Sequence, residues 1–522
     1  MMPAHTMIHV RDLDGAIEFY VKAFGLEVVE RHACDGARLV YLCAADSDYE
    51  LELVCPAHWT FADSPEPGRT HIAFAVKNLE AEHRRLSALD LEPGTITAYH
   101  ANGIFQTRYF YLNDPEGNQI EVLESRGRYG SRGEAMPNIM RDLPGTGFTN
   151  DAAQSYTPDA AFYFDQSLYQ GELAAIFHRN WLYFCHQSQI PRPGDYVAAD
   201  IAGQSIYVIR DKSGAVYGFF NVCQHRAHQL LTPGSGNIRN TIRCPYHSWT
   251  YDLDGSLRGA PKCEEVTGFR REDVRLRPIG VEIIGGFIFV NIDPGAEPLS
   301  LAVPHFAAKL LAMCPEAERL QLVKRQDFNI KANWKVVVEN FLENYHSFYS
   351  GPAHRQLSDV IDQDSYRWSI DGKVIEFLGK GGTAESLPYA FHAERRFTGR
   401  EDGFQIVFLW PNMAFIIIPG ASMLLVFLMN PDGAEGTAEP LLYFGLDSDL
   451  DHGTVAAVDW FNNILGPEDV ELVESVQRGL HSLGYTRGRL MVDPGKKEAW
   501  SEHFLHHFNS LNIAAVKQAK SG

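Results

Sequence analysis

Residues 221–250 read NVCQHRAHQLLTPGSGNIRNTIRCPYHSWT and carry the most specific pattern in the chain. The pair Cys223-x-His225 is followed, after 18 intervening residues, by Cys244-x-x-His247. Two Cys and two His match a zinc site in ligand type, but zinc modules usually pair Cys with Cys and His with His. Here each loop supplies one Cys and one His, as a [2Fe–2S] cluster with two Cys on one iron and two His on the other requires.

The segments around these loops alternate in the manner of a small antiparallel barrel, at 205–210, 216–221 and 286–291. The loops also contain Arg226, Pro245, Tyr246 and Trp249, and the region resembles the Rieske iron–sulfur domain. The resemblance implies four cluster ligands, namely Cys223, His225, Cys244 and His247. His186 and His228 lie outside the motif and are expected to be structural or surface histidines.

A second candidate metal site lies further along the chain. Residues 333–346, NWKVVVENFLENYH, have the pattern of one amphipathic helix, with Glu343 and His346 on a shared face. His354 follows in a Gly-Pro loop, and a helical segment at 467–480 offers carboxylates near its start. Two His and one carboxylate suit the facial triad of non-haem Fe(II) oxygenases. A zinc hydrolase could use the same set, but the cluster motif upstream favours iron.

The span from about Pro158 to Ala519 resembles the α subunit of Rieske non-haem iron ring-hydroxylating oxygenases. The resemblance implies that His346, His354 and Asp469 bind a mononuclear iron. Glu468, Glu471 and Glu474 are close to Asp469 in sequence and are alternative acids for this position. Glu343 resembles the acidic bridge that, in the family trimer, links a cluster His of one subunit to an iron His of its neighbour. The spacing between His346 and His354 is longer than is usual in the family.

The same resemblance implies O₂ as cosubstrate and a homotrimer. Electrons would pass from NAD(P)H through a flavin- or ferredoxin-type reductase to the cluster and then to the iron. The chain has no GxGxxG sequence that opens a helix after a strand, so the reductase is expected to be a separate partner. The catalytic candidates are Glu343 and Asp469.

Two substrate classes remain open at the level of sequence. Residues 343–354 and 475–480 resemble the branch that acts on quaternary amines, such as glycine betaine demethylases, in which hydroxylation of an N-methyl group releases formaldehyde. The alternative is hydroxylation of an aromatic ring. Two strand-like segments, 404–411 and 413–419, contain aromatic residues that could line a substrate pocket or belong to the hydrophobic core, and we favour the core. With the nearby Phe427, these aromatic residues are Phe408, Trp410, Phe415 and Phe427.

An internal repeat marks the first 125 residues. His5, Val10 and Leu13 recur as His71, Val76 and Leu79, with a common offset of 66 residues. Each copy has a strand with the His, an amphipathic helix (16–24, 79–89) and further strands that end with a Glu. Two copies facing each other would bring two imidazoles and two carboxylates together, a set that suits a divalent transition metal. The four candidates are His5, Glu52, His71 and Glu121.

This region resembles the vicinal oxygen chelate superfamily and, within it, glyoxalase I. The supporting stretches include His5-Thr-Met, Glu18-Phe19-Tyr20 and Asp114-Pro-Glu-Gly-Asn-Gln-Ile-Glu121. The superfamily also contains epimerases, dioxygenases and binding proteins, so the ligands alone do not fix a reaction.

The predicted fold class is a multidomain α+β protein. Paired βαβββ modules occupy 1–125, a linker rich in Gly, Ser, Arg, Asn and Pro occupies 126–157, and a small all-β Rieske barrel with a helical lead-in occupies 158–290. An α+β helix-grip catalytic domain with an antiparallel sheet occupies 291–522.

Composition excludes several other classes. The net charge of −20 disfavours nucleic acid and anionic membrane as partners. The most apolar window, 412–429, is broken by Pro419 and Gly420 and predicts two buried strands. Eight scattered Cys and no visible export signal predict a cytoplasmic protein.

Three hypotheses follow. The chain is a terminal oxygenase with an accessory front domain, a bifunctional enzyme with an independent glyoxalase-like isomerase, or an electron-transfer or redox-sensing protein with an empty mononuclear site.

Overall fold

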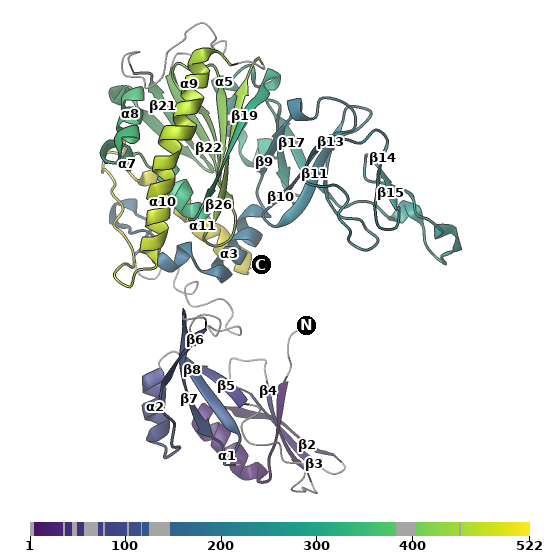
Figure 1. The fold of residues 1–522 in the computed structure, drawn as a ribbon, viewed down its shortest axis with the longest axis vertical. Coiled ribbons are helices and arrows are strands. Elements are labelled where there is room, and N and C mark those ends of the chain that lie inside the picture. The colour runs from purple at the N-terminus through teal and green to yellow at the C-terminus, as the bar shows by residue number, and fades with distance from the viewer. Residues whose placement is uncertain are drawn as a thin grey trace. The chain divides into compact units, whose positions relative to one another are not determined.

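The computed structural model describes residues 5–34, 37–43, 50–56, 71–76, 79–101, 104–115, 117–124, 147–382, 403–447 and 450–521. The chain divides into two compact units, Met1–Asn138 and Ile139–Gly522 (Figure 1). No helix among the described residues is long and apolar enough to cross a membrane.

The N-terminal unit consists of two βαβββ modules, as the repeat predicts. The first contains β1 (His5–His9), α1 (Leu13–Phe24), β2 (Glu27–Cys34), β3 (Ala37–Cys43) and β4 (Glu50–Pro56). The second contains β5 (His71–Val76), α2 (Leu79–Ser87), β6 (Thr97–Ala101), β7 (Ile104–Asn113) and β8 (Gln119–Glu124). Their strand orders are equivalent, β1-β4-β3-β2 and β5-β8-β7-β6, and in each the first and last strands are parallel.

The two modules share one hydrophobic core. Buried residues of the first module, including Tyr20 and Leu53, belong to the same cluster as Phe110 and Val122 of the second. The rings of Phe24 and Phe74 stack across the modules with centroids 4.1 Å apart. The N-terminal unit is therefore one domain built from a duplicated module.

The first part of the C-terminal unit is rich in β-structure. Its main sheet has the order β13-β10-β11-β12-β17-β18-β9, and a smaller sheet has the order β14-β15-β16. The strands are β9 (Leu182–His186), β10 (Asp195–Ile201), β11 (Gln204–Arg210), β12 (Val216–Phe220), β13 (Gly234–Asn237), β14 (Thr241–Arg243), β15 (Thr250–Asp252), β16 (Leu257–Gly259), β17 (Pro278–Ile284) and β18 (Phe287–Asn291).

The second part is an antiparallel sheet with helices packed on it, and α10 crosses in front of the sheet in Figure 1. The strand order is β19-β26-β24-β23-β22-β21-β20, with β25 paired to β26. The strands are β19 (Gln321–Ile330), β20 (Arg367–Asp371), β21 (Val374–Lys380), β22 (Gly403–Leu409), β23 (Met413–Ile417), β24 (Leu424–Leu428), β25 (Asn430–Pro431) and β26 (Thr437–Gly445). The predicted fold class is thus confirmed.

The helices of this part are α4 (Leu299–Ala302), α5 (Pro304–Met313), α6 (Trp334–Leu342), α7 (Tyr345–Tyr349), α8 (Pro352–Val360), α9 (His452–Trp460), α10 (Gly466–Leu480) and α11 (His503–Ser521). A π-helical turn, Phe461–Leu465, joins α9 to α10. Phe287 of β18 packs edge-on against Phe415 and Phe444 of the large sheet, so the two parts share an aromatic contact.

Residues 147–157, which the sequence assigns to the linker, pack against the C-terminal unit. Phe148 is buried and stacks on His506, with ring centroids 4.8 Å apart. Tyr156 forms a β-bridge with Arg489. This stretch therefore docks on the C-terminal unit, because a few aromatic side chains suffice to dock a segment that lacks apolar periodicity. Residues 125–146 lie outside the described part of the chain.

The helix predicted over 333–346 is interrupted. The α6 helix ends at Leu342, Glu343 has extended dihedrals (φ −95°, ψ 139°), and a new short helix begins at Tyr345. His354, expected in a loop, lies instead in the first turn of α8, which has Pro352 at its N-terminus. Glu343 and His346 are close because Glu343 sits before the new helix, rather than because both lie on one helical face.

A buried ion pair attaches the lead-in helix α3 (Gln166–Glu172) to the start of α6. Lys335 Nζ lies 2.6 and 2.8 Å from the two carboxylate oxygens of Glu172, and both side chains are at most 1% exposed. The indole N–H of Trp334 donates to the same carboxylate at 3.0 Å. Burial lowers the pKa of Lys335, and the nearby Glu172 carboxylate opposes that shift.

Replacing Lys335 with Met should destabilise the C-terminal unit by about 3–5 kcal/mol, because it leaves the Glu172 carboxylate buried without its cation. Urea unfolding followed by tryptophan fluorescence measures the change. Lys324→Met is the matched control, since the Lys324–Asp459 pair is 38% and 53% exposed and should contribute about 1 kcal/mol or less. Equal losses in the two variants would contradict the structural role of the buried pair.

Candidate active site

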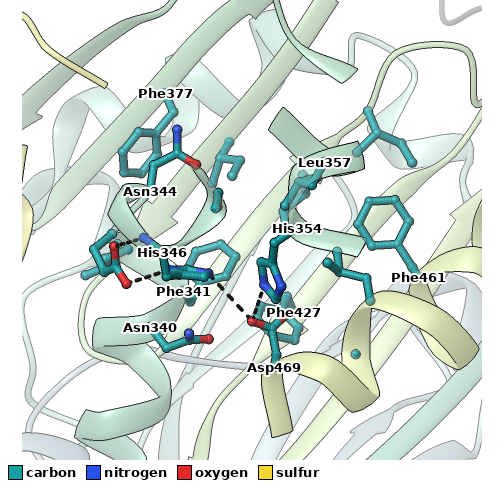
Figure 2. A pocket seen from close by; sticks show the side chains of 18 of the residues that line it. Asn340, Phe341, Asn344, His346, His354, Leu357, Phe377, Phe427, Phe461 and Asp469 are labelled. Atoms are coloured by element: carbon teal, nitrogen blue, oxygen red, sulfur yellow. Dashed lines mark hydrogen bonds and ion pairs between the residues drawn. The ribbon is translucent and has the colours of Figure 1, made fainter. Parts of the chain in front are cut away.

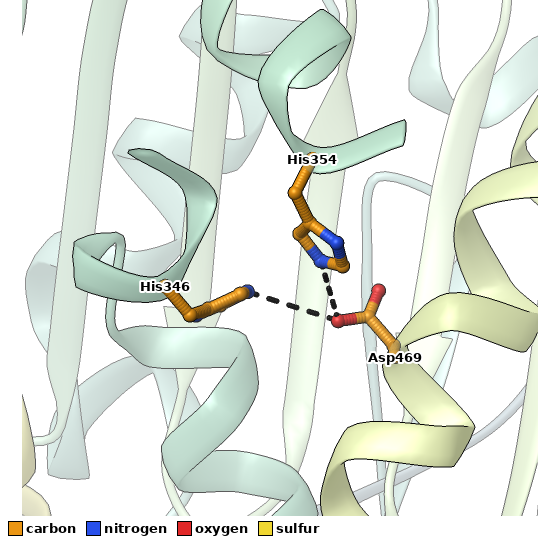
Figure 3. A group of neighbouring side chains, drawn as sticks. All are labelled: His346, His354 and Asp469. Carbon is orange, nitrogen blue, oxygen red and sulfur yellow. Dashed lines mark hydrogen bonds and ion pairs between the residues drawn. The ribbon is translucent and has the colours of Figure 1, made fainter. Parts of the chain in front are cut away.

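Three helices bring the predicted iron ligands together. His346 comes from α7, His354 from α8 and Asp469 from the first turn of α10 (Figure 3). His354 Nε2 lies 2.9 Å, and His346 Nε2 3.7 Å, from Asp469 Oδ1. One ligand atom from each residue lies within 4.8 Å of the others.

This geometry fits a mononuclear metal ion. Ligands about 2.1 Å from a metal on one octahedral face stand about 3 Å apart, close to the spacing of these side chains. Two imidazoles and one carboxylate leave the remaining positions open, as a 2-His-1-carboxylate oxygenase site does.

A second layer of carboxylates orients both imidazoles. Glu343 accepts from the backbone N–H of His346 at 3.0 Å and lies 2.5 Å from its Nδ1. Glu468 lies 2.6 Å from Nδ1 of His354 and accepts from the backbone N–H groups of Ala353 and His354, each at 3.2 Å. Placing the ring protons on Nδ1 leaves each Nε2 lone pair free for a metal.

The electrostatics match these contacts. Burial alone would raise the pKa of Glu468, but the hydrogen bonds from His354 and Ala353 outweigh it and lower that pKa. Burial opposes charge on His354, yet Asp469 and Glu468 together raise its pKa. The pair of carboxylates therefore favours positive charge at this position, which a metal cation can supply.

The structure separates the four acids that the sequence left as candidates. Asp469 faces the two His, whereas Glu468 lies on the far side of His354. Glu471 is exposed, and Glu474 accepts from the backbone N–H of Lys331 at 3.0 Å. Asp469 alone of the four joins the group.

An apolar cavity of about 160 Å³ opens onto this site (Figure 2). Six phenylalanines stand among its lining residues: Phe328, Phe341, Phe377, Phe404, Phe427 and Phe461. Of the four aromatic residues singled out from the sequence, only Phe427 lines the cavity, whereas Phe408, Trp410 and Phe415 are at most 3% exposed and belong to the core.

The charged residues of the cavity wall are all acidic. Glu343, Glu439 and Asp469 line it, together with the two His, and no Lys or Arg does so among the residues that the structure describes. Sequence reasoning missed Glu439. The available signal was a single acidic residue within the otherwise apolar strand β26.

The cluster motif forms two loops with matching backbone geometry. In each loop the residue four positions after the Cys, Ala227 or Ser248, has a positive φ (55° and 60°) and donates its N–H to the Cys carbonyl. Cys223 and Cys244 are buried, His225 is exposed and His247 is half-buried.

The two imidazoles of the motif lie side by side. The ring centroids of His225 and His247 are 4.6 Å apart, and Trp249 stacks on His225 at 4.8 Å. The hydroxyl of Tyr251 lies 3.3 Å from the sulfur of Cys223. Two buried thiols and two outward imidazoles fit the donor set of a cluster with one sulfur-ligated and one His-ligated iron.

His186 lies apart from this group and has a structural environment. It is fully buried, with Nδ1 2.8 Å from Ser188 Oγ and Nε2 3.1 Å from the carbonyl of Ala317. Burial lowers its pKa to about 4, so the ring is neutral near pH 7.

The predicted front metal site is described only in part. Glu52 is 8% exposed and accepts from the hydroxyl of Tyr41 at 2.9 Å. In the first module Glu52 pairs in register with Met7, which lies two residues after His5. In the second module Glu121 pairs with Ala73, which lies two residues after His71. The His and the Glu therefore occupy equivalent places in the two modules. The side chains of His5 and His71 lie outside the described part of the structure. The metal site stays a prediction.

Three family sequence profiles match the chain. The "Rieske [2Fe-2S] domain" matches residues 180–270, and the "Ring hydroxylating alpha subunit (catalytic domain)" matches 317–514. The "Glyoxalase/Bleomycin resistance protein/Dioxygenase superfamily" matches 3–122.

Related proteins and structures agree with these matches. The carnitine monooxygenase oxygenase subunit of Escherichia coli K12 is 35% identical over 386 residues, which is 73% of this chain and all of that protein. The chloroplastic choline monooxygenase of Spinacia oleracea is 28% identical, over 68% of this chain and 77% of that protein. The quaternary ammonium Rieske monooxygenase CntA with L-carnitine superposes with a TM-score of 0.62 at 33% identity, over 70% of this chain and 97% of that one.

The chain thus belongs to the Rieske non-haem iron oxygenases, as an oxygenase (α) subunit, and it carries an N-terminal glyoxalase-superfamily domain. Membership implies a [2Fe–2S] cluster, a mononuclear iron, O₂ as cosubstrate and a reductase that supplies electrons. The naphthalene 1,2-dioxygenase of Rhodococcus shares the fold, with a TM-score of 0.58 at 23% identity, over 69% of this chain and 94% of that one.

Removing the Glu468 carboxylate should weaken iron binding by about 10- to 100-fold, because outer partners that orient ligating His residues contribute about that much. The measurement is the iron content of Glu468→Ala after anaerobic titration with Fe(II), normalised to cluster absorbance. Glu471→Ala, on the exposed side of α10, is the control.

Gly351→Ala provides an independent test of the same contact. A Cβ at Gly351 would stand 2.3 Å from Cδ of Glu468, so the carboxylate must move away from His354. Iron affinity equal to wild type in both Glu468→Ala and Gly351→Ala would show that Glu468 does not position His354.

Proposed function

We propose that this protein is a terminal oxygenase that hydroxylates a quaternary ammonium compound at a carbon next to nitrogen. The observation that carries the proposal is a three-ligand metal site beneath an apolar, phenylalanine-lined cavity whose only charged walls, within the described residues, are acidic. A permanent organic cation fits such a cavity, because aromatic faces and carboxylates both attract positive charge. The names of the carnitine and choline monooxygenases point to the same substrate class.

The residues have distinct roles in this proposal. His346, His354 and Asp469 hold the iron, which activates O₂ when bound, while Glu343 and Glu468 hold the two imidazoles in place. In the Rieske domain, Cys223 and Cys244 bind one iron of the cluster, and His225 and His247 bind the other.

The chemistry balances with two electrons from the reductase. One C–H bond of the substrate becomes C–OH, and O₂, two electrons and two protons also yield one water. A hydroxyl on a carbon next to nitrogen then loses its proton as the C–N bond breaks, which gives an amine and a carbonyl compound. Attack on an N-methyl carbon releases formaldehyde, whereas attack on another adjacent carbon releases the trialkylamine.

Electron delivery requires a partner and a second subunit. A flavin- or ferredoxin-type reductase takes electrons from NAD(P)H and reduces the cluster. In a homotrimer, Glu343 links the cluster of one subunit to His346 of the next; a CntA structure is described as giving insight into inter-subunit electron transfer. The front domain binds a divalent metal through His5, Glu52, His71 and Glu121, in an accessory or second catalytic role.

Oxygen consumption tests this function. With a reductase and NADH, carnitine or choline should stimulate O₂ uptake, with an amine and a carbonyl product in equal amounts. Asp469→Ala should lose this activity and bind about two iron and two sulfide per chain, against about three iron and two sulfide in wild type.

Metal analysis separates the alternative hypotheses. No substrate-dependent O₂ uptake with any amine or aromatic compound, and about two iron in wild type, would indicate an electron carrier. Stimulation by an aromatic compound alone would favour ring hydroxylation. An additional nickel, zinc, manganese or cobalt would place a metal in the front domain, and residues 1–125 should then be assayed with hemithioacetals.

A further inference from the structure

Glu439 has a buried carboxylate that no described residue neutralises. It is the third residue of β26, is 7% exposed and lines the active-site cavity. Two other buried acids of this domain have cations as partners: Glu172 pairs with Lys335, and Glu376 with Lys309. Glu439 receives neither an ion pair nor a side-chain hydrogen bond from any residue that the structure describes.

The position of Glu439 directs its carboxylate toward the cavity. Strand residues two apart share a face, and Leu441, two positions later, also lines the cavity. On the neighbouring strand β19, Phe328 pairs in register with Glu439, and both Phe328 and Ile330 line the same cavity. The carboxylate therefore stands in an apolar wall that faces the substrate space.

An unpaired carboxylate in such a wall is unfavourable unless a cation or a proton neutralises it. Burial raises the pKa of Glu439 well above its usual range, and the negative charge of Asp469 raises it further. The other two acids of the cavity are already engaged, Glu343 with His346 and Asp469 with His354. Glu439 is thus the acid of the cavity that is available to a ligand.

The residues around Glu439 are better suited to binding an organic cation than to binding a metal ion. The ring centroids of Phe341 and Phe427 are 5.0 Å apart in the same cavity, and four further phenylalanines line it: Phe328, Phe377, Phe404 and Phe461. Aromatic faces attract an ammonium group but contribute nothing to a hydrated metal ion's preferred oxygen shell.

We propose that Glu439 is the counter-ion of the substrate's ammonium group and sets the preference of the site for cations over neutral molecules of the same shape. This inference rests on the proposed function and deepens it. It gives Glu439 a role in recognition, separate from the iron ligands and from the two carboxylates that hold them.

The test compares ligands of one shape that differ only in charge. Choline and carnitine are each paired with the isostere in which carbon replaces the quaternary nitrogen, which removes the positive charge and leaves the rest of the molecule unchanged. Binding is measured by calorimetry under anaerobic conditions with the full chain, loaded with cluster and iron. Wild type should bind each cation more tightly than its isostere, and Glu439→Gln should weaken the cations by roughly 30-fold or more while changing the isosteres little.

Two further variants control for charge and structure. Glu439→Asp keeps the negative charge and should retain most of the cation preference, whereas Glu471→Gln removes an exposed charge from α10 and should retain all of it. Iron content and cluster absorbance report whether each variant is intact. If Glu439→Gln does not fold, the ratio of cation affinity to isostere affinity is compared between wild type and Glu439→Asp. A preference for cations in both proteins supports the counter-ion role, and no preference in wild type overturns it.

The outcomes distinguish the two proposals. Selective loss of cation binding in Glu439→Gln supports the counter-ion role. Equal effects on cation and isostere, or no preference for cations in wild type, overturn that role, and the proposed function stands if carnitine or choline is still turned over. If wild type neither binds nor oxidises these cations but does oxidise neutral compounds, the proposed function and the counter-ion role both fail.

Discussion

The buried ion pair between Lys335 and Glu172 fixes the start of α6, and the arrangement of the active site follows from it. Removing two charges from water is costly, so this pair is stable only because it is well satisfied. Trp334 donates to the same carboxylate, and Lys335 Nζ lies 4.6 Å from the ring centroid of Phe162. The nine-residue helix that follows is short and rigid, so its far end has a defined position.

The C-terminal end of α6 places three side chains at the site. Asn340 and Phe341 line the cavity, and Glu343 follows where the helix ends. The extended backbone at Glu343 turns the chain, so that a carboxylate stands at the beginning of the next short helix and accepts from His346. A continuous helix would carry His346 one turn further along the same axis. The helix break is therefore part of the candidate metal site.

The side of the site formed by α8 and α10 depends on the backbone at the start of each helix. A π-helical turn at 461–465 joins α9 to α10, and Asp469 lies in the turn that follows, a place where such bulges often occur. The N-terminus of α8 rests on the Glu468 carboxylate, which is favourable for the helix dipole. Gly351 has no Cβ, and only for that reason can the chain approach Glu468 so closely.

Much of this architecture could be predicted from the sequence, because it depends on local patterns. The duplicated modules follow from a repeat with matching strand and helix periods, and the two cluster loops follow from the positions of Cys and His. The helix break at Glu343 could not be predicted, since residues 343–346 (ENYH) continue an acceptable helical period in the sequence. Docking of residues 147–157 likewise depends on Arg489 and His506, more than 300 residues away in the chain.

The carboxylates around the cavity show why residue type alone could not assign roles. Glu343, Glu439, Glu468 and Asp469 carry the same functional group, yet their partners differ in every case. Two accept from imidazole Nδ1 atoms, one faces the imidazole Nε2 atoms, and one stands alone in an apolar wall. The chemistry of each acid is set by the group opposite it, and that group comes from a different helix or strand. Where no described protein group stands opposite, as at Glu439, the missing partner is most simply the ligand itself.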